Sequence, residues 1–357
     1  MENLINKGCT VLDDRYCRSF SKLQESVLKN FQELYSQGTN KQLWGVLTTS
    51  GMQAIYNVID HIINKHVKMI DKIHVLYASD LYCDTERTIK YIQRNRNIKI
   101  HKFNITNSQS VSNILNKLEK NSFVVLFFES VSNPYGHVFD FAQIRHYRKS
   151  VRKMYIVVDN TWMSGVLFNP FKFDVDIVVN STSKYYSNGK HIGGVILSTI
   201  KQIANTIIFE NRIIGTHISP FNLQQILDNW ETLPSRIQQS SIKTKKLIAK
   251  LKSKSKSKFE ITYPFGNELY KKYINTEYGP SLFLVRINKN IKVVKKMMMN
   301  QDLVSYSTSY GTPYTKIDSY PFSDPNDNSK TFLRLYVGYD EEDLDLLNKK
   351  LLGLFKC

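Results

Sequence analysis

The stretch FDVDIVVNSTSKYYSNGKHIGGVILS, residues 173–198, places a lysine just beyond a run that has the character of a buried strand. Ile177 to Val179 are apolar and β-branched, which favours a strand packed inside a sheet. Lys184 follows among serine, threonine and tyrosine hydroxyls, ahead of the turn-forming pair Asn188–Gly189. A lysine after a strand, considered alone, is usually a surface cation. Its surroundings here make Lys184 a candidate functional residue.

The region from about 45 to 200 alternates between strand-like and helix-like segments. Its apolar runs are continuous, which is typical of parallel strands that are covered on both faces. Between them lie segments whose apolar residues have helical spacing. The pattern predicts a three-layer α/β/α domain with a mostly parallel sheet. The expected strands include residues 73–79, 122–130, 154–160, 176–182 and 193–198.

After about residue 205 the pattern changes to a long helical region, 220–253, followed by strand-like runs and a closing helix. This is α+β composition, and a chain of 357 residues also favours a second domain. The expected division is an N-terminal arm and helix over 1–40, a large domain over 41–215 and a small domain over 216–357.

The composition, with 42% hydrophobic and 22% charged residues, is ordinary for a soluble globular protein. No stretch approaches the roughly 20 apolar residues of a membrane span, so we expect a cytoplasmic protein without a membrane partner. The four cysteines have neither disulfide-framework nor metal-ligand spacing, and no metal site is expected. The net charge of +18 is concentrated in residues 243–258, where we expect a solvated basic face rather than a nucleic-acid-binding surface.

Polar side chains follow three of the expected strands. These strand ends are Glu129 to Pro134, Asp159 to Thr161, and Ser181 to Lys184. In open α/β sheets, ligands bind at the carboxyl ends of the strands. Converging ends that supply an acid, an amide, hydroxyls and a lysine therefore indicate a binding site.

These residue types match the needs of pyridoxal phosphate (PLP). PLP enzymes use a lysine that forms a Schiff base with the aldehyde, a carboxylate for the pyridine nitrogen and a phosphate cradle. Lys184 and Asp159 supply the first two. Ser50 and Gly51 start a predicted helix, whose free N–H groups attract phosphate. Taken singly, Asp159 and Ser50 would also serve as helix N-caps. Further candidate donors are the hydroxyls of Ser181 and Ser183.

The order of these motifs resembles that of the PLP-dependent enzymes of cysteine and methionine metabolism. These include cystathionine γ-synthase, the cystathionine lyases and O-acetylhomoserine sulfhydrylase. The resemblance spans roughly residues 45–340 and implies fold type I of the PLP-dependent transferases, as in aspartate aminotransferase. The matching motifs are Ser50–Gly51–Met52, Tyr82 to Thr85, Glu129 with Ser132–Asn133–Pro134, Asp159–Asn160–Thr161, Ser181 to Tyr185, Gly193–Gly194 and Arg334 to Gly338.

The resemblance implies a role for each matching residue. Lys184 would carry the Schiff base and then move the substrate's proton, while Asp159 would pair with the pyridine nitrogen. Tyr82 would stack on the ring and assist the leaving group. Arg334 would grip the substrate α-carboxylate through two hydrogen bonds. The other implied cofactor-binding residues are Ser50, Gly51, Met52, Asn133, Thr161, Ser181 and Ser183, and the other implied substrate-binding residues are Ser309 and Tyr310.

The N-terminal arm adds an expected partner. Family members use a Tyr-x-Arg motif to reach the phosphate of a neighbouring subunit's cofactor, and Tyr16 and Arg18 match it. The resemblance therefore implies a homodimer or homotetramer with shared active sites. A chance pairing of a basic and an aromatic residue is the alternative.

The substrate motifs depart from the family pattern, whereas the cofactor motifs are kept. Tyr314 stands where the family has glutamate, and Cys83–Asp84 replace two glycines. An aromatic residue at Tyr310 is closer to the β-lyases, which have tryptophan there. We expect an enzyme for elimination or replacement at Cβ or Cγ of a sulfur-containing or O-acylated amino acid. Another fold type I activity, such as transamination, and a retired enzyme that binds nucleic acid are the open alternatives.

Overall fold

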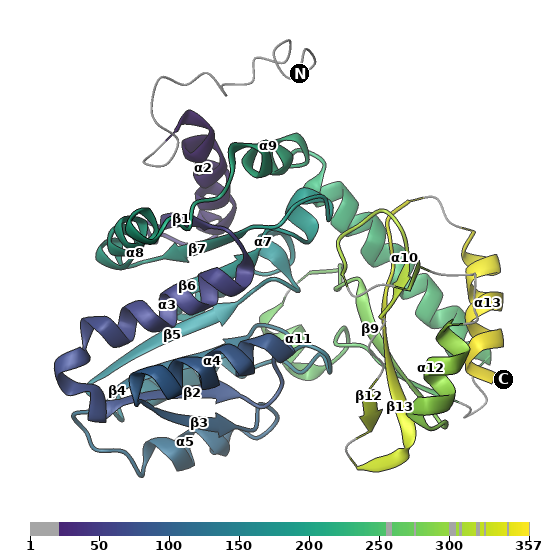
Figure 1. Ribbon diagram of the computed structural model, residues 1–357. Helices are drawn as coiled ribbons and strands as arrows, with labels where there is room; N and C mark the ends of the chain where they lie inside the picture. Colours follow the sequence, from purple (N-terminus) through teal and green to yellow (C-terminus); the bar gives the residue numbers. More distant parts are fainter. Residues whose placement is uncertain are drawn as a thin grey trace. The chain divides into compact units, whose positions relative to one another are not determined.

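The computed structural model describes residues 21–254, 259–274, 276–299, 305–306, 309–318, 322–324, 326–340 and 343–356 (Figure 1). The chain divides into two compact units. The first contains the residues up to Asn133 and those from His137 to Glu231; the second contains Pro134–Gly136 and the residues from Thr232 onwards. The domain limits at 40 and 215 stay predictions.

The first unit is built on a seven-stranded sheet with the order β1-β7-β6-β5-β4-β2-β3. Strands β2 to β6 pair in parallel, whereas β7 is antiparallel to its neighbours β1 and β6. The predicted, mostly parallel sheet is therefore confirmed. The strands are β1 (Trp44–Thr48), β2 (Ile73–Ala78), β3 (Lys99–Phe103), β4 (Phe123–Glu129), β5 (Lys153–Asp159), β6 (Ile177–Ser181) and β7 (Gly194–Ser198).

Helices α3, α4 and α8 cover one face of this sheet (Figure 1). The apolar stripe of α3, including Ile55, Ile59 and Ile62, packs in one core with the strand residues Val125 and Val157. Burial of such a stripe is what stabilises a helix on a sheet. The helices of the unit are α2 (Lys22–Ser36), α3 (Gly51–Lys65), α4 (Cys83–Arg96), α5 (Gln109–Leu115), α6 (Ile144–Arg148), α7 (Ser164–Leu167), α8 (Lys201–Ile214) and α9 (Pro220–Asp228).

Aromatic side chains pack on the opposite face. Phe127 of β4 points into the core with α3, and the next residue, Phe128, points the other way. Phe128 stacks on Phe139 with ring centroids 3.8 Å apart and meets the edge of Phe141. Both faces of β4 are buried, which explains its continuous apolar sequence.

The second unit contains an antiparallel sheet in the order β10-β11-β13-β9-β8, with β12 paired to β13 and a parallel step between β10 and β11. One face packs against α10, α12 and α13. No helix in the described part of the chain is long and apolar enough to cross a membrane. The elements are α10 (Leu233–Lys254), β8 (Phe259–Thr262), α11 (Glu268–Tyr273), β9 (Leu282–Ile287), α12 (Ile291–Met299), β10 (Ser305–Tyr306), β11 (Lys316–Ile317), β12 (Phe322–Asp324), β13 (Asp327–Tyr336) and α13 (Leu344–Lys356).

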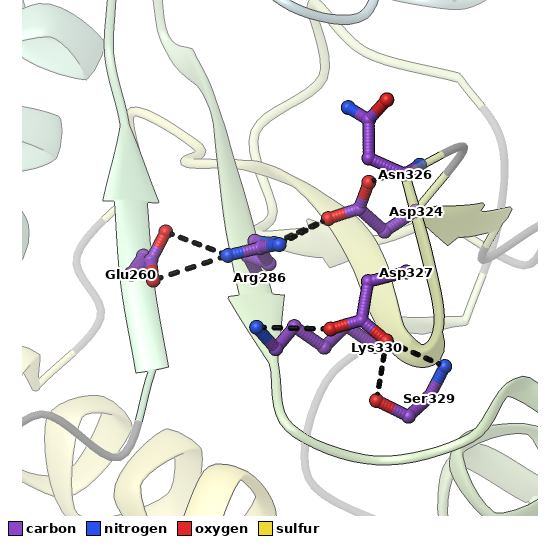
Figure 2. Close-up of polar contacts among 7 residues, drawn as sticks. All are labelled: Glu260, Arg286, Asp324, Asn326, Asp327, Ser329 and Lys330. Atoms are coloured by element: carbon purple, nitrogen blue, oxygen red, sulfur yellow. Dashed lines mark hydrogen bonds and ion pairs between the residues drawn. The ribbon is translucent and has the colours of Figure 1, made fainter.

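Charged side chains join the strands of this second sheet (Figure 2). Arg286 of β9 lies between Glu260 of β8, at 3.2 Å, and Asp324 of β12, at 2.5 Å. Asp327 and Lys330 form a further pair within β13, at 3.0 Å. Val285 and Ile287, on either side of Arg286, belong to the apolar core. The period of two along β9 places Arg286 opposite Val285 and Ile287, on a face whose other β9 residues, Leu282 and Leu284, are also buried.

Candidate active site

Lys184 lies three residues beyond the end of β6. A short 3-10 turn, Tyr185–Ser187, follows it and leads towards β7. The chain reverses at Asn188 and Gly189, whose φ angles of 58° and 73° suit residues that tolerate the left-handed region. The Gly189 amide closes the turn by donating to the Lys184 carbonyl at 3.0 Å. The predicted Asn-Gly turn is thus present, and it holds Lys184 at the carboxyl end of β6.

Asp159 ends β5, the strand beside β6. The Thr161 amide donates to its Oδ1 at 2.8 Å, and the Thr161 hydroxyl accepts from the Ser181 amide at 2.8 Å. Thr161 therefore connects the ends of the two strands. Burial raises the pKa of the Asp159 carboxyl, against the opposing effects of hydrogen bonds from Thr161 and of the positive charge of Lys184. The acid and the lysine are close enough to interact electrostatically.

The N-terminus of α3 lies against the end of β6. Ser50 caps the helix by accepting from the Gln53 amide at 3.0 Å. A Cβ on Gly51 would lie 2.7 Å from the Ser181 Cβ, closer than such atoms approach in proteins. A Cβ on Gly194 would likewise lie 2.4 Å from the Ser50 carbonyl oxygen. Glycine at both positions lets the positive end of the helix dipole meet the Ser181 hydroxyl, which is the arrangement of a phosphate cradle.

Two further predicted phosphate contacts lie beside this cradle. Ser183 accepts from the Gly193 amide at 3.0 Å, which ties the lysine loop to the start of β7. Met52, on the first turn of α3, packs partly against the core. Ser50 and Met52 also line a groove of about 600 Å³ between α3 and α4, together with Arg87 of α4.

Tyr82 and Asn133 come from the loops that follow β2 and β4. The Tyr82 side chain is exposed, and its backbone amide donates to Glu129 Oε1 at 2.6 Å. The Asn133 amide donates to Glu129 Oε2, also at 2.6 Å. The two predicted ring-contacting residues are thus held by one buried carboxylate. The sequence marked Glu129 only as part of a motif.

A buried hydrogen-bond network under the strand ends was missed by sequence reasoning. The Tyr35 hydroxyl of α2 donates to Asn180 Oδ1 at 2.9 Å and accepts from Asn160 Nδ2 at 2.9 Å. Burial raises the pKa of Tyr35 to about 12. Asn160 immediately follows Asp159, and Asn180 immediately precedes Ser181. The network therefore ties α2 to both strand ends. Its partners lie 125 and 145 residues apart in the sequence, and no local pattern marks such a pairing.

The predicted substrate-binding residues belong to the second unit. Arg334 of β13 forms an ion pair with Asp318 at 2.5 Å, and both side chains are largely buried. The Asp318 amide also donates to the Arg334 carbonyl at 2.9 Å. Tyr310 is buried with its ring 6.3 Å from that of Tyr336, and Ser309 precedes it. The cofactor candidates described above therefore lie in the first unit, and the substrate candidates lie in the second. Tyr16 and Arg18 lie outside the described residues.

Comparison with known proteins gives this site a context. The family model described as Cys/Met metabolism PLP-dependent enzyme matches residues 15–339. The chain belongs to this family. It is 25% identical to the cystathionine beta-lyase of Schizosaccharomyces pombe over 286 residues, covering 76% of this chain and 71% of the relative. It is 30% identical to the enzyme of the same name from Neurospora crassa over 221 residues, covering 60% of this chain and 45% of the relative.

Solved structures of the family share the fold. A putative O-acetylhomoserine (thiol)-lyase of Campylobacter jejuni has a TM-score of 0.78 at 21% identity, covering 96% of this chain and 87% of that one. A Corynebacterium glutamicum protein of the same fold has a TM-score of 0.79 at 19% identity, with coverages of 96% and 87%. Together with the family match, these comparisons confirm fold type I and a PLP-dependent enzyme. The glycine-lined cradle, the buried carboxylate and the lysine fit that cofactor.

Proposed function

We propose that the protein catalyses β-elimination on a sulfur-containing amino acid of the cystathionine type. The observation that carries the proposal is the linked pair of strand ends, in which Thr161 joins the Asp159 carboxyl to Ser181 and Lys184 interacts with the same acid. Bound PLP would supply an electron sink for the substrate α-carbon. Both curated relatives named above are cystathionine beta-lyases, and the aromatic Tyr310 is in keeping with them.

The residues of the first unit divide the work between binding and proton transfer. Lys184 would hold the cofactor aldehyde and move the substrate's α-proton. Asp159 would keep a proton on the pyridine nitrogen, since a buried carboxylate gains most from a cationic partner. Tyr82 would contact the ring and assist departure of the thiol. The phosphate would be held by the amides of Gly51 and Met52 and the hydroxyls of Ser181 and Ser183, with Thr161 and Asn133 completing the cofactor contacts.

The products of cystathionine decide between β- and γ-chemistry. Elimination at Cβ releases homocysteine, pyruvate and ammonia, whereas elimination at Cγ releases cysteine, 2-oxobutyrate and ammonia. Protein loaded with PLP is incubated with cystathionine, and keto acid, thiol and ammonia are measured together. Pyruvate with an equal amount of homocysteine is expected. 2-Oxobutyrate would move the proposal to γ-elimination, and a keto acid formed without ammonia would point to transamination.

Arg334→Lys is expected to raise KM for the amino-acid substrate by about 10- to 100-fold, with a smaller change in kcat. A lysine keeps the charge but loses the two-pronged contact with the α-carboxylate, and a hydrogen bond to a charged group is worth about that factor. Steady-state kinetics measure the effect. Arg286→Lys, a change of the same kind at an arginine in the second unit's sheet, serves as the control. An unchanged KM in the Arg334 variant would show that this arginine does not bind substrate.

We further propose that the protein is a cytoplasmic homo-oligomer with shared active sites. Support comes from the match of Tyr16 and Arg18 to the family's Tyr-x-Arg arm, which reaches a neighbouring subunit's phosphate. The groove of about 600 Å³ between α3 and α4 opens beside the phosphate cradle and has room for such an arm. Light scattering of the full chain tests the oligomer. Arg18→Ala should weaken PLP binding without changing the mass of the oligomer measured by light scattering.

A further inference from the structure

The carboxylate of Glu129 bridges the two loops that carry the proposed ring contacts. Glu129 is the last residue of β4, and its side chain is buried at 5% exposure. Its Oε1 accepts from the Tyr82 amide and its Oε2 from the Asn133 amide, both at 2.6 Å. Strands β2 and β4 are parallel neighbours, so the loops that follow them leave the same edge of the sheet. One rigid carboxylate therefore fixes two backbones relative to each other.

The hydrogen bonds of Glu129 indicate a role different from that of the neighbouring acid, Asp159. Glu129 and Asp159 are directly opposite each other in the register of β4 and β5. Asp159 receives one backbone amide through a single oxygen, from Thr161 at 2.8 Å. Glu129 receives one amide on each oxygen, so both oxygens act as acceptors for main chain. With both oxygens engaged by main chain, Glu129 is suited to holding structure rather than to passing protons.

A second contact joins the same two loops further out. His137 Nδ1 lies 2.6 Å from Asp80 Oδ2, and the histidine is more exposed than the aspartate. This contact does not involve the residues that face the proposed ring. The buried bridge at Glu129 acts on Tyr82 and Asn133 themselves, through their own amides. Its effect on the position of these two residues is therefore direct.

We propose that Glu129 is the positioning residue that sets the spacing between Tyr82 and Asn133, and therefore the position of the PLP ring. The inference rests on the proposed function, because it takes Tyr82 and Asn133 as ring contacts. A hydrogen bond to a charged acceptor is worth about a factor of ten or more. Losing one of the two should let a loop drift and loosen the cofactor.

Two variants of Glu129 test separately the length and the charge of its side chain. Glu129→Gln keeps the shape but turns an N–H towards one of the two amides, so it can satisfy only one. Glu129→Asp keeps the charge but is shorter by one methylene and cannot span both. If Glu129 positions the Tyr82 and Asn133 loops, both variants should fail to hold the two loops in the same way. Glu33→Gln, the same change at an exposed residue of α2, is the matched control.

The first readout is independent of the cofactor. Hydrogen exchange of the cofactor-free full chain, followed on the peptides that contain Tyr82 and Asn133, should be about tenfold faster or more in the Glu129 variants. The Glu33 variant should match the wild type. Unchanged exchange in both Glu129 variants would overturn the bridge itself. Should Glu129→Gln fail to fold, by far-UV circular dichroism, Glu129→Asp carries the same test.

The second readout is the equilibrium affinity for PLP, followed by absorbance and by circular dichroism in the cofactor band. Both Glu129 variants should bind PLP about tenfold more weakly or worse, with a changed dichroic signal. Faster exchange with unchanged affinity and signal would overturn the positioning role, since the carboxylate would then serve the fold alone. If the wild type itself binds no PLP, the proposed function fails. In that case the exchange result still decides whether Glu129 holds the two amides, while the cofactor role is overturned.

Discussion

Lys184→Ala is expected to lower kcat by at least about 10²- to 10⁴-fold, the range that positioned proton transfer usually contributes. The ε-amine is proposed both to hold PLP and to move the substrate proton, so its loss removes two functions together. Purified protein with PLP should show an absorbance band near the visible edge that is absent from the variant. Turnover of cystathionine, measured in the same samples, should fall with the band.

Lys190→Ala is the matched control, because Lys190 is exposed in the same loop. That variant should keep both the band and the turnover. A small primary amine added to Lys184→Ala should restore part of the activity, since it can take over the proton transfer. Undiminished band and turnover in Lys184→Ala would show that another residue holds the cofactor.

The strands buried on both faces were predictable because burial leaves an unbroken apolar sequence. β2, β4, β5, β6 and β7 all appear where the sequence placed them. β3 (Lys99–Phe103) was missed because it lies at the sheet edge, where its sequence KIHKF carries polar residues. β1 (Trp44–Thr48) was missed although it is as long as β6 and β7; it lies at the other edge of the sheet and has Gly45 in its interior, which weakens a strand pattern. The long helical region is in fact two helices, α9 and α10, separated by residues 229–232.

The candidate site shows a similar division. Lys184, Asp159 and Gly51 could be named as candidates in advance because a lysine, an acid and a helix-starting glycine occur together at strand ends and a helix start, although each alone has an ordinary structural explanation. The role of Glu129 could not be predicted, since its partners are main-chain amides that carry no sequence signal. The pairing of Arg334 with Asp318 depends on the register of β11 and β13, which sequence alone does not fix.

Asp159→Asn is expected to lower kcat/KM by about 10²-fold or more, while leaving the cofactor-free protein at least as stable as the wild type. The variant keeps an oxygen that can accept from the Thr161 amide, so the local structure has a reason to persist. It loses the negative charge that is proposed to hold the proton on the pyridine nitrogen. Removal of one preorganised electrostatic group from a site usually costs about 10²- to 10³-fold in rate.

The stability half of this prediction follows from the sign of the pKa shift. Burial raises the pKa of Asp159 in the folded protein, so the folded state holds the proton more tightly than the unfolded state. The protonated Asp159 side chain therefore stabilises the folded protein relative to the unfolded one. This contribution is fully present below the unfolded pKa of about 3.9 and is lost as pH rises through the folded pKa. Asparagine does not titrate, so the variant avoids this loss. Its free energy of unfolding relative to wild type should improve as pH increases from about 4 towards neutrality.

Urea unfolding of the cofactor-free proteins across this pH range measures the difference, and steady-state kinetics with PLP measure the activity. Asp228→Asn, at the exposed end of α9, is the control and should change neither. An Asp159→Asn variant that has a higher free energy of unfolding but a lower kcat/KM would identify Asp159 as a buried charge retained for the cofactor. A variant with wild-type kcat/KM would remove the carboxylate from the proposed site. Loss of stability at neutral pH in Asp159→Asn would instead make the residue part of the fold's own hydrogen bonding.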